Sequence, residues 1–232
     1  MLRLSISHDC SLLVVRRHLI FDLDGTLIDS RIGIVRCVNY ALESCGLPAI
    51  DDSKDTAWLV GPPLQENFGK LVGHDIEGAL TEKLIEAYRK RFESTGIFEN
   101  SLVPGIEELV RELRRDGKRL TVATTKPTPY ARRIIEHHRL DHIFEMVIGS
   151  EFNGLRSSKD ELIKYVIESS GDDTTYCLVI GDRESDVLAA KRANIDSVGV
   201  LYGYGTRPEI MSSEPTFVAD NVQQLADLLR RM

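Results

Sequence analysis

Cysteine is scarce in this sequence, and the four cysteines present, Cys10, Cys37, Cys45 and Cys177, lie far apart. No two of them form a CxxC pair or another spacing typical of a metal site. Scattered thiols in a chain of this length are typical of reduced, packed side chains in a cytosolic protein. We therefore expect a cytoplasmic protein without a disulfide framework, with a bond between some two of the four left open.

Long hydrophobic runs are also missing. Near the N-terminus, residues 12–15 are apolar, but Arg16 and Arg17 follow at once. A bilayer span needs about 20 apolar residues, and a signal peptide needs a longer apolar core with a small-residue cleavage site. We therefore expect no membrane partner.

Positive charge is in deficit, because 29 Lys and Arg residues face 36 Asp and Glu residues, a net charge of −7 over 232 residues. Binding to polymeric nucleic acid requires a basic stripe, so no such partner is expected. An anionic substrate would instead need a few specifically placed cations. The length permits one large domain, or a core domain with a smaller insertion.

Short apolar segments alternate with helical patterns along most of the chain. The segments that read as strands are residues 18–21, 119–123, 146–148, 176–180, 197–200 and, most weakly, 217–218. Between them apolar residues recur at helical spacing, as at Ile106, Leu109 and Leu113. Apolar strands separated by helices predict an α/β fold with a Rossmann-like parallel sheet that is buried on both faces.

Residues 31–100 break this alternation, because they hold helical patterns and no convincing strand. The first helix is expected to begin at a Ser30 cap and to end at Gly46. An all-helical block inside an alternating chain predicts an inserted domain that lies over the sheet edge. The expected organisation is a tail or edge strand over residues 1–17, an α/β core over 18–30 and 101–232, and a helical cap over 31–100.

Two aspartates follow the first predicted strand, in the segment HLIFDLDGT. Alternate side chains of an extended chain share a face, so Asp22 and Asp24 are expected to point the same way. Carboxylates this close repel each other, so a ligand must bind between them or one must hold a proton. The structural alternative is a strand followed by an Asp-rich turn.

The second predicted strand ends in Thr124 and Thr125, at the edge where open α/β sheets bind ligands. A hydroxyl group together with turn N–H groups suits a phosphate oxygen, and an ordinary capping turn is the alternative. The next residue, Lys126, is expected to be a solvated loop lysine. Lys159 is predicted in the first turn of a later helix, where a nearby anion would offset its unfavourable interaction with the helix dipole.

A further acidic pair lies in the segment GDRESD, where Asp182 falls at a strand tip and Asp186 one helical turn later. Both carboxylates can therefore face the strand ends. Oxygen ligands that leave room for water and phosphate suit Mg²⁺. The alternative is capping of a helix N-terminus by acidic residues.

In combination, DLDGT, the strand-end Thr, the Lys and GDxxxD resemble, in order, the haloacid dehalogenase superfamily of phosphohydrolases, from about His18 to Met232. The helical insertion, the segment GPPL at residues 61–64 and the loop LYGYG at residues 201–205 resemble the subgroup that contains phosphoglycolate phosphatases and 5′-nucleotidases. This resemblance implies Mg²⁺-dependent hydrolysis of small phosphorylated metabolites through an aspartyl-phosphate. It favours 2-phosphoglycolate, with a nucleoside 5′-monophosphate as the alternative, and leaves a monomer or a dimer open.

The same resemblance implies roles for individual residues. Asp22 would be the nucleophile and Asp24 the general acid and base. The phosphate would be bound by Thr124 and Lys159, with Thr125 beside them. The implied metal site consists of Asp22, Asp24, Asp182 and Asp186, with Asp24 acting through its main-chain carbonyl.

Other activities remain open on the sequence alone. A dehalogenase of the same superfamily would need neither Asp24 nor Asp182, whereas a sugar-phosphate mutase would use both aspartates of DLDGT. A phosphonate hydrolase would need a Schiff-base lysine in the cap, for which Lys54, Lys70 and Lys83 are candidates. A non-hydrolytic phosphoacceptor signalling domain would be shorter, without the helical insertion. A non-catalytic binding module is typically missing a motif aspartate.

Overall fold

The central element of the computed structural model, which describes residues 15–51, 55–73 and 78–232, is a six-stranded parallel sheet in the order β5-β4-β1-β6-β7-β8. Its strands are β1 (His18–Phe21), β4 (Arg119–Pro127), β5 (Met146–Ser150), β6 (Cys177–Gly181), β7 (Asp196–Val200) and β8 (Phe217–Ala219). Phe21 pairs with Val122 and with Ile180, so β1 and β6 end together and their following residues meet at one edge. Most of the predicted tail, residues 1–14, lies outside the described residues.

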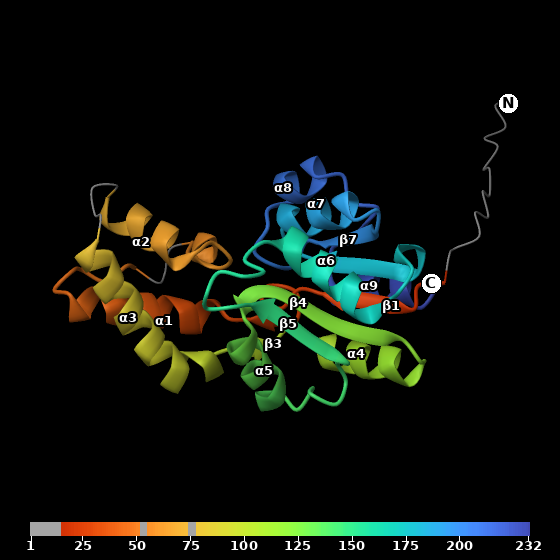
Figure 1. Ribbon diagram of the computed structural model, residues 1–232, viewed down its shortest axis with the longest axis horizontal. Coiled ribbons are helices and arrows are strands. Elements are labelled where there is room, and N and C mark those ends of the chain that lie inside the picture. Colours follow the sequence, from red (N-terminus) through yellow and green to blue (C-terminus); the bar gives the residue numbers. More distant parts are fainter. Residues whose placement is uncertain (1–14, 52–54, 74–77) are drawn as a thin grey trace, which may run out of the picture.

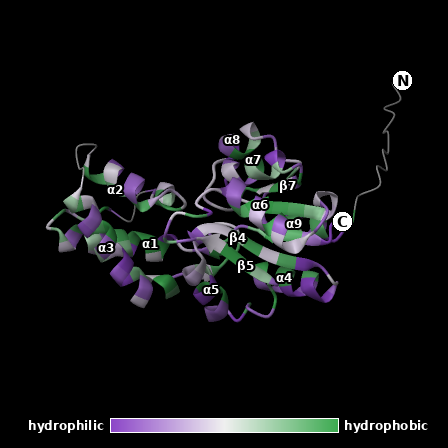
Figure 2. Cartoon of the chain, in the orientation of Figure 1, coloured by the Kyte–Doolittle hydropathy of each residue, from purple (hydrophilic) through white to green (hydrophobic). Residues whose placement is uncertain are grey.

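Helices cover both faces of this sheet (Figure 1). One face is covered by α4 (Ile106–Arg115), α5 (Thr128–His137) and α9 (Val222–Leu229), and the other by α6 (Lys159–Ser170) and α7 (Glu184–Arg192). A short helix, α8 (Arg207–Ser212), follows β7. The side chains of Leu19 and Phe21 in β1 pack into the core on one face of the sheet, and Ile20 packs into the core on the other face. All three residues must therefore be apolar. The predicted α/β fold is therefore confirmed, and Figure 2 shows its strands as largely hydrophobic.

The described residues within 31–100 form three helices that lie together beside the sheet, at the left of Figure 1. They are α1 (Arg31–Ser44), α2 (Leu64–Val72) and α3 (Ala79–Ser94), accompanied by short 3₁₀ turns at Ala57–Leu59 and Gly96–Phe98. The chain enters and leaves this region through an antiparallel pair, β2 (Ile28–Asp29) with β3 (Ser101–Leu102). The two connections therefore lie side by side, as in a hinge.

No helix within the described ranges has both the length and the apolar character that a membrane crossing requires. Cys37 and Cys177 are buried free thiols, Cys45 is a partly exposed one, and Cys10 lies outside the described residues.

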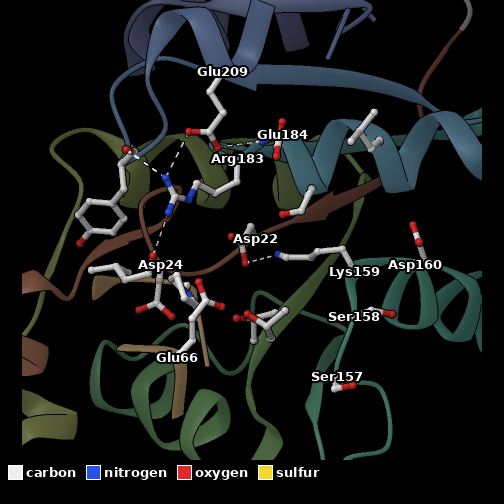
Figure 3. Close-up of a pocket in the computed structure, with 18 of the residues that line it drawn as sticks. Asp22, Asp24, Glu66, Ser157, Ser158, Lys159, Asp160, Arg183, Glu184 and Glu209 are labelled. Carbon is white, nitrogen blue, oxygen red and sulfur yellow. Dashed lines mark hydrogen bonds and ion pairs between the residues drawn. The ribbon is translucent and has the colours of Figure 1, made fainter. Parts of the chain in front are cut away.

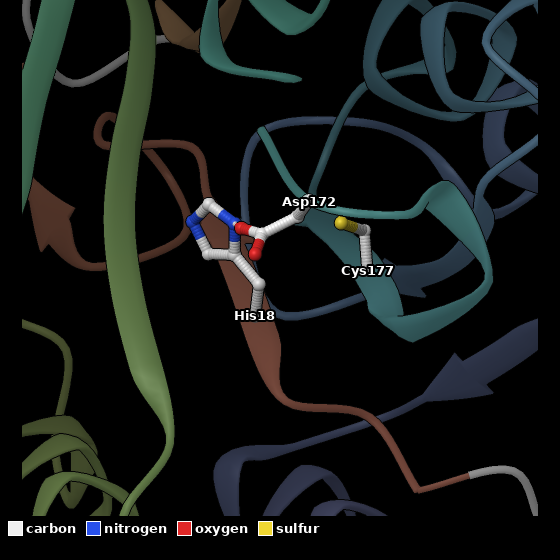
Figure 4. A group of neighbouring side chains, drawn as sticks. All are labelled: His18, Asp172 and Cys177. Carbon is white, nitrogen blue, oxygen red and sulfur yellow. Dashed lines mark hydrogen bonds and ion pairs between the residues drawn. The ribbon is translucent and has the colours of Figure 1, made fainter. Parts of the chain in front are cut away.

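A polar cluster is buried near the amino-terminal ends of β1 and β6 (Figure 4). His18 Nδ1 lies 2.6 Å from Asp172 Oδ2, and His18 Nε2 lies 2.8 Å from Thr121 Oγ1. Burial lowers the pKa of His18, although Asp172 opposes this effect. Cys177 lies close enough for the group to resemble a metal site, but Arg119 donates to Asp172 at 2.6 Å. Because both ring nitrogens and the carboxylate have partners, we interpret the cluster as a structural network.

Candidate active site

A cavity of about 610 Å³ lies between the carboxyl edge of the sheet and the helices of residues 31–100. Asp22, Asp24, Thr124, Thr125 and Lys159 all line it, each from the end of a strand or the start of a helix. Residues 60–62 and Glu66 line it from the helical region. These five predicted site residues therefore converge on one cavity, although they are spread over more than a hundred positions, whereas Asp182 and Asp186 lie beside Asp22 and do not line the cavity.

Asp22 and Lys159 form the buried centre of this site (Figure 3). The Nζ atom of Lys159 lies 2.6 Å from Asp22 Oδ1 and 2.8 Å from Asp186 Oδ1, and it donates to the carbonyl of Ala123 at 3.1 Å. Burial alone would lower the pKa of Lys159, but Asp186 and Asp22 outweigh burial and raise it. Lys159 is therefore a fixed positive charge beside the carboxylate of Asp22.

Three carboxylates, those of Asp22, Asp182 and Asp186, offer oxygen atoms that all lie within 4.8 Å of one another. Burial raises the pKa of Asp22 to about 6 and the pKa of Asp182 to about 8, and repulsion within the trio adds to both shifts. Lys159 compensates only part of this charge. A divalent cation would complete the balance, and hard oxygen ligands are those that Mg²⁺ prefers.

Asp182 is fully buried and tightly enclosed. Its Oδ2 atom accepts from the backbone N–H of Tyr204 at 2.7 Å, and its Oδ1 atom accepts from Thr26 Oγ1 at 3.1 Å. A Cβ atom at Gly25 would lie 2.2 Å from Asp182 Oδ2, and one at Gly203 would lie 2.3 Å from Asp182 Cβ. These two positions must be glycine because any side chain there would displace the carboxylate.

The side chain of Asp24 has different partners from that of Asp22. Its Oδ1 atom accepts from Ser30 Oγ and from Lys126 Nζ, the latter at 2.8 Å. Our expectation that Lys126 is solvated is wrong, because its side chain is 8% exposed and lies between Asp24 and the ring of Phe92. The expected cap role of the Ser30 side chain is also wrong, because its hydroxyl turns to Asp24 and makes no cap bond to α1.

The two threonines lie near the carboxyl end of β4, which continues to Pro127 and is therefore longer than the strand predicted over residues 119–123. Thr124 is 1% exposed, and its Oγ1 atom accepts from the N–H of Lys126 at 3.2 Å. The carbonyl of Thr125, which still lies within β4, accepts from Ser150 Oγ at 2.7 Å, and this bond joins β4 to the end of β5. Lys126 follows these residues at the tip of a central strand, a position that could have marked it as a site residue.

Arg183, which follows Asp182 directly, was not predicted as a site residue. One guanidinium nitrogen donates to the carbonyl of Val60 in the helical region at 3.2 Å, and another lies 3.4 Å from Glu209 (Figure 3). Arg183 thus links the helical region to the sheet. Its place inside GDRESD, beside a predicted metal ligand, was the available signal.

A parallel sheet with a lysine and clustered carboxylates at its carboxyl edge defines an α/β enzyme that is suited to phosphoryl chemistry. Residues 19–200 match the haloacid dehalogenase-like hydrolase family, and the chain belongs to this family.

Several known proteins resemble the chain along most of its length. It is 40% identical over 215 residues to a 5′-nucleotidase of Pseudomonas aeruginosa, covering 91% of this chain and 95% of the relative. It is 37% identical over 212 residues to the tyrosine-protein kinase PtkA of Mycobacterium tuberculosis, covering 90% and 71%. A phosphoglycolate phosphatase of Aliivibrio fischeri is 27% identical over 216 residues, covering 90% and 94%.

The crystal structure of a predicted phosphatase from Clostridium acetobutylicum superposes with a TM-score of 0.85 at 34% identity, covering 94% of this chain and all of the other. The family, these relatives and this structure together identify the chain as a phosphomonoester hydrolase.

Proposed function

We propose that this hydrolase uses Mg²⁺ and forms an aspartyl-phosphate on Asp22. The observation that carries the proposal is the position of Asp22, whose carboxylate faces the cavity and is held by Lys159 beside two further carboxylates. Phosphate monoesters react so slowly in water that enzymes accelerate their hydrolysis by up to about 10²¹-fold. A carboxylate nucleophile divides this task into two easier steps.

In the first step, an oxygen of Asp22 bonds to phosphorus while the bond from phosphorus to the leaving oxygen breaks. Asp24 donates a proton to that oxygen, which leaves as an alcohol. In the second step, Asp24 takes a proton from water as the water attacks phosphorus, and the bond to Asp22 breaks to release inorganic phosphate. Ser30 and Lys126, which hold Asp24 Oδ1, position this acid and base.

The donor set around Asp22 fits Mg²⁺. Asp22, Asp182 and Asp186 would hold the ion, and the main-chain carbonyl of Asp24 is a further proposed ligand. When bound, Mg²⁺ supplies the positive charge that shields the anionic nucleophile from the anionic phosphate. Lys159 and Thr124 would bind phosphate oxygens, with Thr125 beside them.

We further propose that α1, α2 and α3 form a cap over the cavity. Glu66 and residues 60–62 already line the cavity from this side. Closure of such a cap would exclude bulk water during phosphoryl transfer. A small phosphorylated metabolite would let the cap close, whereas a large substrate would hold it open.

The charges of the residues that line the cavity favour one of the two candidate substrates over the other. Among the described residues that line the cavity, the cations are Lys159, Arg183 and Arg192, and each has an acidic partner: Asp22 with Asp186, Glu209, and Asp160 respectively. Glu66 adds a carboxylate on the cap side, where it pairs with Lys70 at 2.7 Å. The cavity therefore offers little to a second anion, such as the carboxylate of 2-phosphoglycolate. We place a nucleoside 5′-monophosphate first, in agreement with the 40% identical 5′-nucleotidase, and 2-phosphoglycolate second.

Phosphate release from a substrate panel tests this proposal. We expect hydrolysis with Mg²⁺ and none in excess chelator, with kcat/KM at least about tenfold higher for the best nucleoside 5′-monophosphate than for 2-phosphoglycolate. Full activity in chelator would contradict the metal site. A single burst without turnover would instead indicate a phosphoacceptor domain.

Glu66→Gln tests the role of charge in substrate choice. Removing this carboxylate should raise kcat/KM for 2-phosphoglycolate about fivefold relative to the nucleoside 5′-monophosphate, because a negative charge is lost near the leaving group and Lys70 loses its acidic partner. Glu43→Gln, on the exposed face of α1, removes the same charge away from the cavity and serves as the control. An unchanged ratio, or an equal change in the control, would contradict the charge argument.

A further inference from the structure

Tyr204 contacts both the acid cluster and the hinge of the helical region. Its backbone N–H donates to Asp182 Oδ2 at 2.7 Å. Its hydroxyl accepts from the backbone N–H groups of Ser30 at 2.8 Å and Arg31 at 3.1 Å, and it donates to Asp29 Oδ1 at 2.7 Å. One residue therefore bridges a carboxylate of the acid trio and the first turn of α1.

The loop that carries Tyr204 is pressed against Asp182. A Cβ atom at Gly203 would lie 2.3 Å from Asp182 Cβ, and one at Gly205 would lie 1.9 Å from the Asp182 carbonyl oxygen. The two glycines on either side of Tyr204 thus permit this approach. A displacement of Tyr204 would therefore move the carboxylate of Asp182.

A second contact runs from the same place to the helical region. Arg183, adjacent to Asp182, donates to the carbonyl of Val60 at 3.2 Å and to that of Tyr204 at 3.4 Å. Residues beside Asp182 therefore reach α1 at its beginning and the segment before α2. Movement of the proposed cap must change these contacts.

We propose that Tyr204 is a positioning residue that couples closure of the cap to the placement of Asp182. The inference rests on the proposed function, because it takes residues 31–100 as a cap and Asp182 as a site residue. The hydroxyl group fixes the first turn of α1, while the backbone of the same residue fixes Asp182. When the cap closes, the carboxylate of Asp182 is therefore already in position. Such a preorganised site does not have to rearrange during the reaction.

Tyr204→Phe tests this coupling because it removes only the hydroxyl and keeps both the ring and the backbone N–H. The matched control is Tyr202→Phe in the same loop, where the hydroxyl donates to the carbonyl of Thr26 at 3.3 Å. Trp58, the single tryptophan of the chain, lies in the helical region and reports on it through its fluorescence. We would titrate orthovanadate, a phosphate analogue, in the presence of Mg²⁺ while following this emission.

In Tyr204→Phe, the vanadate concentration at half-change of the Trp58 emission should rise about tenfold, as for the loss of one or two net hydrogen bonds. KM for a nucleoside 5′-monophosphate should rise with it, whereas kcat should change less than about threefold. Tyr202→Phe should stay within about twofold of the parent on both measures. Asp29→Ala, at an exposed position, should act in the same direction, and its effect should be less than additive with that of Tyr204→Phe, because both variants remove the hydrogen bond between the Tyr204 hydroxyl and Asp29. This second variant carries the test if Tyr204→Phe does not fold.

The coupling is overturned if Tyr204→Phe and Asp29→Ala titrate like the parent, or if Tyr202→Phe shifts as much as Tyr204→Phe. It is also overturned if the only change is a lower melting temperature. A parent chain that neither releases phosphate nor responds to vanadate would overturn the proposed function and this inference together. If only the coupling is wrong, the parent chain still releases phosphate and responds to vanadate, and the variants behave like the parent.

Discussion

Asp22→Asn is expected to abolish turnover while leaving the fold intact. The amide has almost the same shape as the carboxylate but cannot form the phosphoenzyme, so kcat should fall at least about a hundredfold. Phosphate release, with circular dichroism for the fold and mass spectrometry to detect deamidation, measures this effect.

The matched control is Asp160→Asn, an exposed aspartate that lines the same cavity and pairs with Arg192. This control should keep kcat within about threefold of the parent, because it removes a charge without touching the reacting atoms. Retained activity in Asp22→Asn after deamidation has been ruled out would remove Asp22 as the nucleophile.

Asp182→Asn should have two opposite effects, a loss of Mg²⁺-dependent turnover and a gain in the stability of the metal-free protein. Burial raises the pKa of Asp182 from an ordinary value of 3.8 to about 8. Between these values the folded state binds a proton that the unfolded state does not, so the free energy of unfolding falls as the pH rises through this window. The Asp182→Asn protein has no such pH dependence from this position, because asparagine does not titrate. In chelator at pH 8, its free energy of unfolding should exceed that of the parent by at least about 1 kcal/mol.

Urea unfolding of both proteins in chelator, at pH 5 and pH 8, measures this second effect. Adding Mg²⁺ should then stabilise the parent and leave Asp182→Asn almost unchanged, because a ligand stabilises only a fold that binds it. Equal Mg²⁺ stabilisation of both proteins would contradict the placement of the metal at Asp182. So would a variant that is less stable than the parent in chelator at pH 8.

The strand tips could be predicted because a strand that is buried on both faces must be apolar along its length, and its first polar residues then mark its end. Asp22 and Asp182 were found in this way. α5 was not among the predicted helices, although TPYARRIIEH has a proline in its first turn and places Tyr130, Ala131, Ile134 and Ile135 at helical spacing. The β2–β3 pair was missed because two residues a strand leave no periodic pattern.

The partners of the site residues could not be predicted from spacing. Lys126 lies 102 positions from Asp24, and the ion pair exists only because β1 and β4 are neighbours in the sheet. In the same way, Tyr204 reaches Asp29 across 175 positions because its loop lies beside Asp182. Motif spacing identifies which groups can react, whereas strand order determines which other groups hold them in place.

Detection of a phosphoryl group on Asp22 tests the central claim most directly. The protein would be mixed with Mg²⁺ and an excess of its best substrate, quenched in acid within one turnover, and digested for peptide mass spectrometry. We predict the mass of one phosphoryl group on the peptide that contains residue 22, its loss after hydroxylamine treatment, and its absence from Asp22→Asn. Phosphate release without any such adduct, or a phosphoryl group on another residue, would contradict the account.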